Sequence, residues 1–175
     1  PKLSFQANQY SGVLTNSPST SINQSLNQPI QGFALPTFSL DSGLAFERDA
    51  REMKGFFGRD MIVTMEPRAF YVYTPFQSQA QTPLFDTADA GFGITQIFSE
   101  NTFVGNDRVA DNNKLTMGLT SRVLETNTGA ERATVTLAQR QDFTGQRVGL
   151  NGTIQNPTRY SDTLGASTIR LLGNF

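Results

Sequence analysis

The segment Met61–Thr74 alternates apolar and polar side chains with a period of two over most of its length. An extended chain has this period, because successive side chains point to opposite faces of a strand. The usual strand of a soluble domain has only about five or six residues, so this segment is more than twice as long. It therefore predicts an unusually long β-strand with one apolar face and one polar face.

Further segments show the same alternation and predict an all-β chain. The pattern is clear in the first three of them and weaker in the last two, over residues 35–49, 115–123, 133–140, 2–9 and 162–172. Composition agrees, because only 17% of the residues are charged and the chain has 15 Gly and 14 Phe. Such a chain favours strands and turns over helices. We predict about six antiparallel strands that run up and down.

The connections between these strands fall into two length classes. Residues 50–60 and 125–130 are short links, whereas residues 10–34, 75–114 and 144–161 are long. If the strands alternate in direction, both short links lie at one end of the sheet and all the long ones at the other. Up-and-down membrane barrels have this asymmetry, with short periplasmic turns and longer extracellular loops. The two short links are therefore predicted to face the periplasm, and residues 75–114 to lie outside or to fold into the mouth of a barrel.

Strand length and the polar faces favour a membrane barrel over a soluble sheet. About 9 to 11 residues in a tilted strand cross a bilayer, and several of the predicted strands reach this length. Their polar faces mix charged side chains with small hydroxyl residues, as barrel interiors do. Tyr71 and Tyr73 near a long loop, and Phe56 and Phe57 near a short one, lie where aromatic girdles belong. A half-buried sheet in a soluble protein also alternates, so a soluble all-β domain stays open as the alternative.

The period of two assigns each side chain to one face. A register error of one residue would place arginines in hydrocarbon, where an unpaired Arg costs about 2–4 kcal/mol at the midplane. The side chains predicted to contact lipid are Val63, Met65, Ala69, Met117, Leu119, Val135 and Leu137. The side chains predicted to face the lumen are Thr64, Glu66, Arg68, Thr120, Arg122, Thr134 and Arg140.

Three neighbouring residues of the segment Met61–Thr74 carry further hypotheses. Glu66 and Arg68 are either a charge pair that contacts a plug or a ligand in the lumen, or ordinary members of a ladder of lumen charges. Pro67 lies between them and has no N–H group, so it cannot donate a hydrogen bond to a neighbouring strand. It therefore predicts a bulge or a locally weakened pairing.

The sequence argues against an enzyme. It has no Cys and no His, which excludes thiolate zinc, imidazole ligands and His-based triads. The net charge of −1 gives no basic surface for nucleic acid. Five residues offer oxygen ligands in a short stretch, but they miss the spacing of a calcium loop, and we interpret them as caps of their own loop: Asn106, Asp107, Asp111, Asn112 and Asn113. We predict no catalytic residues, no metal and no cofactor.

Seven stretches are more specific than the periodicity. They are FSLDSGLAFERD at 38–49, FGRD at 57–60, MEPRAFYVY at 65–73, FSEN at 98–101, GNDRVADNN at 105–113, LTSR at 119–122 and TGAER at 128–132. In order and approximate spacing, these stretches strongly resemble the barrel domain of the lipopolysaccharide-assembly outer-membrane protein family, LptD, also called organic solvent tolerance proteins. The resemblance covers residues 35–147. Residues 141–143 and 77–78 depart from the family pattern. These departures affect what the resemblance implies about contacts of the loops, and not the family itself.

The resemblance implies that residues 1–175 are part of a large β-barrel in the outer membrane of a Gram-negative bacterium. Barrels of this family deliver lipopolysaccharide to the outer leaflet and hold a plug lipoprotein inside. The implied partners are therefore an LptE-like plug, lipopolysaccharide, outer-membrane lipid and the remaining strands of a parent barrel. The chain is similar to the middle strands, about a quarter to a third of such a barrel. We expect it to be a piece of a longer protein.

Three functions remain at this point. The first is a non-enzymatic part of the outer-membrane translocon that inserts lipopolysaccharide into the outer leaflet. The alternative from another class is a soluble all-β adhesin or tail-fibre module that binds glycans through loops rich in Asn, Gln and Tyr. The third is a closed eight-stranded barrel with a purely structural role, which a chain of about six strands disfavours.

Overall fold

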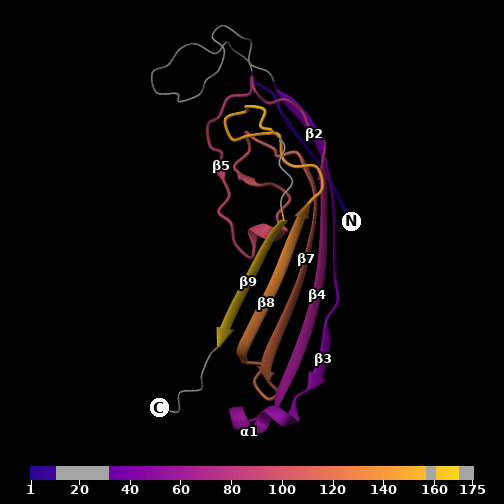
Figure 1. The fold of residues 1–175 in the computed structure, drawn as a ribbon, viewed down its shortest axis with the longest axis vertical. Helices are drawn as coiled ribbons and strands as arrows, with labels where there is room; N and C mark the ends of the chain where they lie inside the picture. The colour runs from indigo at the N-terminus through magenta and orange to yellow at the C-terminus, as the bar shows by residue number, and fades with distance from the viewer. Residues whose placement is uncertain (11–31, 157–160, 170–175) are drawn as a thin grey trace.

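The structure, a computed structural model, describes residues 1–10, 32–156 and 161–169. Its main element is one antiparallel sheet whose strands are neighbours in chain order, β1–β2–β4–β7–β8–β9, with β3 also paired to β4 (Figure 1). The strands of this sheet are β1 (Lys2–Asn8), β2 (Phe33–Gly43), β3 (Phe46–Asp49), β4 (Met61–Thr74), β7 (Asn112–Glu125), β8 (Glu131–Asp142) and β9 (Ser161–Ile169). The predicted all-β fold of antiparallel up-and-down strands is confirmed.

The central strands are as long as the sequence predicts, or longer. β4 has the predicted bounds and 14 residues, while β7 and β8, with 14 and 12 residues, extend beyond the predicted segments at both ends. β9 begins at Ser161, and residues 170–172 of the segment predicted there lie outside the described residues. Most of the long connection predicted over residues 10–34 also lies outside them.

Pro67 divides the strand that pairs with β4 into β2 and β3. The register is the same on both sides of the break, because Gly43 lies opposite Arg68 and Phe46 lies opposite Met65. At the break the residue after β2 donates its N–H to the Pro67 carbonyl, but Pro67 has no N–H to donate in return. β2 and β3 are therefore one interrupted strand. Pro67 weakens the pairing, as predicted, without forming a bulge.

The link between β3 and β4, which the sequence predicted as a short connection, is helical. The segment η1 (Arg51–Met53) leads into α1 (Lys54–Phe57). Gly58 ends the helix with a left-handed φ of 69°, and its N–H donates to the Lys54 carbonyl at 2.7 Å. The glycine therefore acts as a helix C-cap. In the described part of the chain, no helix is long and apolar enough to cross a membrane.

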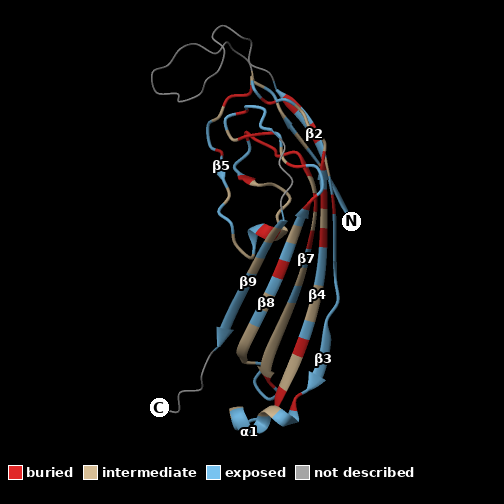
Figure 2. Cartoon of the chain, in the orientation of Figure 1, coloured by how far each residue is buried: buried red, intermediate tan, exposed pale blue. Residues whose placement is uncertain are grey.

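The long connection after β4 folds back over one face of the sheet. We call residues 75–111 the inserted segment; it contains β5 (Ala88–Asp89), η2 (Gln96–Phe98) and β6 (Phe103–Val104), and β5 pairs with β6. In Figure 1 it lies to the left of the upper part of the strands. In Figure 2 much of the buried chain lies in this upper part of the molecule. The other face of the sheet has no such cover among the described residues.

The apolar core lies between the sheet and the docked loops and among these loops, rather than between two sheets. Phe33 and Leu35 of β2 pack with Val109 of the inserted segment. A second cluster joins Phe103 and Ala110 of the inserted segment to residues of the loop that follows β8. The described chain is therefore a single-layer sheet with loops docked on one side, which differs from a sandwich of two packed sheets.

Candidate functional site

Strand pairing places the two predicted sets of residues on opposite faces of the sheet. Thr64 lies opposite Arg122, which lies opposite Thr134, whereas Leu119 lies opposite Leu137 on the other face. The polar face holds all members of one predicted set, Thr64, Glu66, Arg68, Thr120, Arg122, Thr134 and Arg140. The apolar face holds all members of the other, Val63, Met65, Ala69, Met117, Leu119, Val135 and Leu137.

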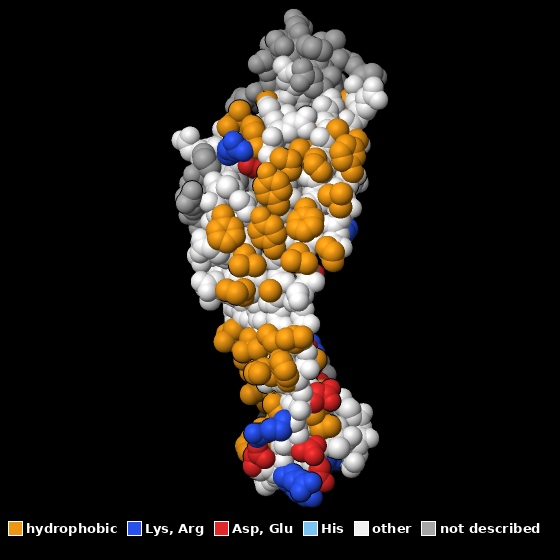
Figure 3. All heavy atoms as spheres, turned by 90° about the vertical axis from the view of Figure 1, so that its right-hand side faces the viewer, with side chains coloured by type: hydrophobic (Ala, Val, Ile, Leu, Met, Phe, Trp, Pro, Cys, Tyr) orange, Lys and Arg blue, Asp and Glu red, His pale blue; other side chains and the backbone are white. Residues whose placement is uncertain are grey.

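The apolar face leaves large side chains uncovered. Met65, Met117 and Leu137 are 47%, 56% and 57% exposed, and Phe38 and Tyr73 extend the exposed surface across β2 and β4. Figure 3 shows hydrophobic side chains clustered over the middle of this side of the molecule, with most of the charged side chains at the end near α1. Apolar patches of this extent mark surfaces that contact membrane or protein.

Charged side chains on the polar face form ion pairs between neighbouring strands. Nη1 of Arg122 lies 2.7 Å from both carboxylate oxygens of Glu66. Arg68 donates to both oxygens of Asp41, from Nε at 2.9 Å and from Nη2 at 2.6 Å. Glu66 and Arg68 thus pair with residues of other strands and not with each other, which supports the ladder interpretation of these charges.

The helical turn η2 anchors the inserted segment on the polar face. A Cβ at Gly118 would lie only 2.6 Å from Cζ of Phe98, so the ring occupies the space that a glycine leaves open. The guanidinium of Arg68 lies 4.5 Å from the centroid of the same ring, a cation–π contact. Thr116 completes the anchor by donating its hydroxyl hydrogen to the Ile97 carbonyl at 2.9 Å.

Further bonds extend this docking to β1 and β2. Lys2 and Ser39 both bind the Glu100 carboxylate, at 2.8 Å and 2.6 Å. Gln6 donates its amide to the Asn106 carbonyl at 2.8 Å. The inserted segment therefore contacts β1, β2, β4 and β7, and it braces the sheet across these strands.

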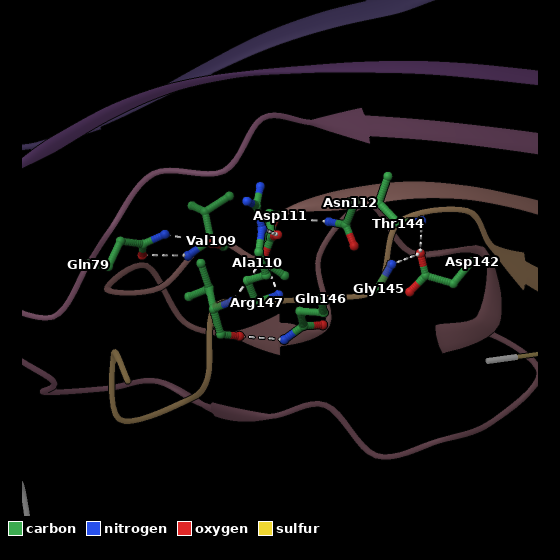
Figure 4. Close-up of polar contacts among 11 residues, drawn as sticks. Gln79, Val109, Ala110, Asp111, Asn112, Asp142, Thr144, Gly145, Gln146 and Arg147 are labelled. Atoms are coloured by element: carbon green, nitrogen blue, oxygen red, sulfur yellow. Dashed lines mark hydrogen bonds and ion pairs between the residues drawn. The ribbon is translucent and has the colours of Figure 1, made fainter. Parts of the chain in front are cut away.

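Arg108 is the buried centre of the docked loops, with 0% of its surface exposed. Its guanidinium donates to the carbonyls of Gln79 at 2.8 Å, Thr82 at 2.6 Å and Leu150 at 3.0 Å. Gln79 in turn exchanges two hydrogen bonds with the backbone of Val109 (Figure 4). One side chain therefore joins the beginning of the inserted segment to its end and to the loop after β8.

Asp111 joins the inserted segment to the loop after β8. Its Oδ1 accepts the N–H groups of Arg147 and Val148, each at 2.9 Å (Figure 4). The interpretation of this residue as a cap of its own loop is wrong, because its partner Arg147 lies 36 residues further along the chain. In the described ranges, no group of three or more His, Cys, Asp or Glu residues could hold a metal ion.

Asp107 makes a similar link within the inserted segment. Its Oδ2 accepts the N–H groups of Phe85 at 2.6 Å and Asp86 at 2.8 Å, and the Tyr10 hydroxyl donates to Oδ1 at 3.1 Å. Burial would raise the pKa of the Asp107 carboxyl, but the N–H groups of Asp86 and Phe85 and the Tyr10 hydroxyl outweigh it, so the pKa is lowered. The charged carboxylate therefore stabilises the docked conformation.

We expect the inserted segment to loosen in acid. A lowered pKa contributes stability that is present above the ordinary carboxyl pKa and is lost as the pH falls through the lowered value. Hydrogen exchange of residues 85–107 in the full-length protein, corrected for the intrinsic exchange rate, should show less protection at about pH 3 than at about pH 7. In Asp107→Asn protection should already be reduced at neutral pH and depend less on pH, whereas Asp60→Asn in the exposed α1–β4 link should behave like wild type. Equal protection of wild type and Asp107→Asn at both pH values would contradict this.

The residues that dock the inserted segment were missed by the sequence reasoning. Gly118 offered one signal, because a glycine inside a strand pattern marks a place where another group approaches closely. Nothing in the sequence identified Phe98 as that group or Arg108 as a buried hub. Their partners are far away in the chain, and only the folded loop brings them together.

The comparisons with known proteins identify the family. A family model described as LptD, LPS transport system D, matches residues 1–175. The chain belongs to this family. The match to the LptD model includes residues 1–31 and 148–175, which lie outside the range 35–147 that carries the sequence resemblance.

LptD relatives are closely similar but much longer. The chain is 52% identical over its whole length to an LPS-assembly protein LptD of Cupriavidus metallidurans, of which it covers 21%. It is 59% identical to that of Ralstonia nicotianae and 48% identical to that of Burkholderia ambifaria, over 78% and 81% of this chain and 17% and 18% of those proteins. The chain thus spans about a fifth of the length of these curated relatives.

Proposed function

We propose that this chain is part of the wall of an outer-membrane β-barrel that inserts lipopolysaccharide into the outer leaflet, without enzymatic activity. One observation carries the proposal: a single-layer sheet has one bare apolar face and one charged face, and long loops dock on the charged face. Lipid can cover the apolar face without a second protein layer, whereas the charged face needs water or protein. The names of the LptD relatives supply the link to lipopolysaccharide assembly.

The proposal assigns the two faces to two environments. The seven predicted residues of the apolar face, such as Val63 and Leu137, contact lipid. The seven predicted residues of the polar face, such as Thr64 and Arg140, line the lumen. Ion pairs such as Glu66–Arg122 support this assignment, because a charged pair at 2.7 Å is far more costly to place in hydrocarbon than in a wet lumen. The soluble adhesin alternative gains no support, since it would leave the apolar face in water.

The partners follow from the same geometry. In the described part of the chain β1 pairs only with β2, and β9 pairs only with β8, so each has an edge that can bond to another strand. We assign these edges to the remaining strands of the parent barrel. Lipopolysaccharide and an LptE-like plug lipoprotein then meet the polar face and the docked loops from the lumen side.

Depletion of the full-length parent protein tests the proposed function. Cells depleted of it should lose newly made lipopolysaccharide from their surface, as measured by labelling of surface glycans. A wild-type copy of the gene should restore the surface lipopolysaccharide. The purified protein should require detergent or lipid to fold. Normal surface lipopolysaccharide after depletion, or a folded full-length protein in the aqueous phase, would overturn the proposal.

The proposed topology gives a separate prediction. The β7–β8 hairpin, with Asn127 exposed at its tip, should face the periplasm because short turns lie on that side. A single cysteine at Asn127 should therefore resist an impermeant thiol reagent in intact cells and react after the outer membrane is permeabilised. Labelling in intact cells would reverse the topology, and a cysteine at Asn127 that stays unreactive after permeabilisation would show that the tip is covered.

A further inference from the structure

A cavity of about 250 Å³ lies where the inserted segment meets β8 on the polar face. Its walls come from the β5–η2 part of the inserted segment, from Arg140 on β8 and from Gln146 in the loop after β8. It is smaller than the pockets of about 300–1,000 Å³ that hold drug-sized ligands, so it suits a single small ring. Under the proposed function it opens toward the lumen.

Three polar side chains of the cavity wall are held in place by hydrogen bonds or an ion pair. Thr102 donates its hydroxyl to Oε1 of Gln146 at 2.9 Å, and Gln146 donates its amide to the Val148 carbonyl at 2.7 Å. Arg140 is fixed by Asp162, with Nη2 2.6 Å from Oδ2. Thr102, Gln146 and Arg140 are therefore a preorganised part of the wall, which lowers the entropic cost of binding a ligand there.

One wall of the cavity is an exposed aromatic ring. Phe92 is 54% exposed, and the Arg140 guanidinium lies 5.4 Å from its ring centroid. A phenyl face carries partial negative charge, so it attracts polarised C–H groups as well as cations. A sugar ring presents such C–H groups on one face and hydroxyl groups around its edge. Phe92 thus offers a stacking surface beside polar groups that can bond the edge.

The charges around the cavity favour a neutral ligand. Arg140 is the cation in the wall, and Asp162 already neutralises it at 2.6 Å. Asp89 adds a carboxylate to the same wall. A phosphate or carboxylate would meet a carboxylate without an unneutralised cation to offset it, whereas the hydroxyls of a neutral sugar can donate to Asp89 and accept from the amide of Gln96.

We propose that this cavity binds one neutral pyranose ring, stacked on Phe92 and bonded at its edge by Asp89 and Gln96. The inference rests on the proposed function, where such a ring belongs to the glycan part of lipopolysaccharide and the cavity is a resting point on its way out. It predicts that phosphorylated and acidic sugars bind this cavity more weakly than neutral sugars do.

Saturation-transfer NMR with the full-length protein in detergent micelles tests the inference. The probes are glucose, galactose and N-acetylglucosamine, their 6-phosphates, and a delipidated neutral oligosaccharide from lipopolysaccharide. We expect the neutral sugars to bind and the 6-phosphates to bind more weakly. Tighter binding of the oligosaccharide than of any free sugar would show that the bound ring belongs to the glycan of lipopolysaccharide. Equal binding would show that the cavity takes a free sugar. No binding of any neutral sugar, or preferred binding of the phosphates, would overturn the inference.

Two phenylalanines of the same loop provide a matched comparison. Phe92→Ala should weaken binding of the neutral sugars about tenfold, because it removes the stacking surface. Phe85→Ala removes a ring that is 76% exposed and lies outside the cavity, and it should bind like wild type. Equal losses in both variants would overturn the assignment to this cavity. Surface lipopolysaccharide, measured in cells with the wild-type protein, separates the two proposals. Delivery without sugar binding by the wild-type protein rejects only the cavity, and sugar binding without delivery rejects only the proposed function.

Discussion

Replacing Leu119 with arginine is expected to cause a large loss of folded protein from the outer membrane. Leu119 is 41% exposed on the apolar face and lies between Pro67 on β4 and Leu137 on β8. If this face contacts lipid, the new guanidinium enters hydrocarbon at a cost of about 2–4 kcal/mol near the midplane. That cost is a large fraction of the stability of a typical protein. The measurement is the amount of heat-modifiable, folded full-length protein recovered from outer membranes.

The adjacent residue supplies the control. Thr120 lies on the polar face, opposite Glu66 and Thr136, and its hydroxyl lies 3.1 Å from that of Thr136. Thr120→Arg should cost far less, because the new cation points toward the ion pairs of the lumen and lies next to a carboxylate. Equal recovery of the two variants would contradict the assignment of the faces, and with it the membrane interpretation of these strands. A larger loss for Thr120→Arg would reverse the two faces.

The difference between these two neighbours illustrates what the sequence could predict. Alternation of apolar and polar residues is a local property of each segment, so it specified the strands themselves. Once the strands paired in chain order, it also specified the faces on which Glu66 of β4 and Leu119 of β7 lie. Up-and-down pairing added little uncertainty, because each strand bonds to the next one along the chain. Local pattern and simple topology together were sufficient for the sheet.

The docked loops could not be predicted in the same way. Residues 75–111 contain few regular elements, and their conformation depends on contacts such as Phe98 on Gly118 and Glu100 with Lys2, which join residues distant in the chain. Glycine, acidic and amide residues in a loop are compatible with turns, caps or metal binding alike. Pro67 was an intermediate case: its missing N–H predicted weakened pairing, but only the register on both sides of the break excluded a bulge.

Replacing Arg108 with methionine is expected to release the inserted segment from the sheet. The side chain is fully buried, and its guanidinium donates to three carbonyls, those of Gln79, Thr82 and Leu150. Methionine fills similar space but donates no hydrogen bond, so these carbonyls lose this donor in a site shielded from water. A buried polar group left unsatisfied costs about 1–3 kcal/mol, which makes this one of the most destabilising single changes in the loops.

Limited proteolysis of the full-length protein in detergent measures this release. Arg108→Met should be cleaved within residues 75–111 at least about tenfold faster than wild type, since a loss of about 1.4 kcal/mol raises the open population tenfold. Arg108→Lys should be intermediate, because one ammonium cannot reach all three carbonyls in the fixed geometry of a guanidinium. Arg48→Met is the matched control: its side chain is 74% exposed and pairs with Glu52 at the far end of the sheet, so its cleavage rate should equal that of wild type. If Arg108→Met were cleaved no faster than Arg48→Met, the contacts of η2 and Glu100 with the strands would be sufficient to hold the segment, and Arg108 would not be its hub.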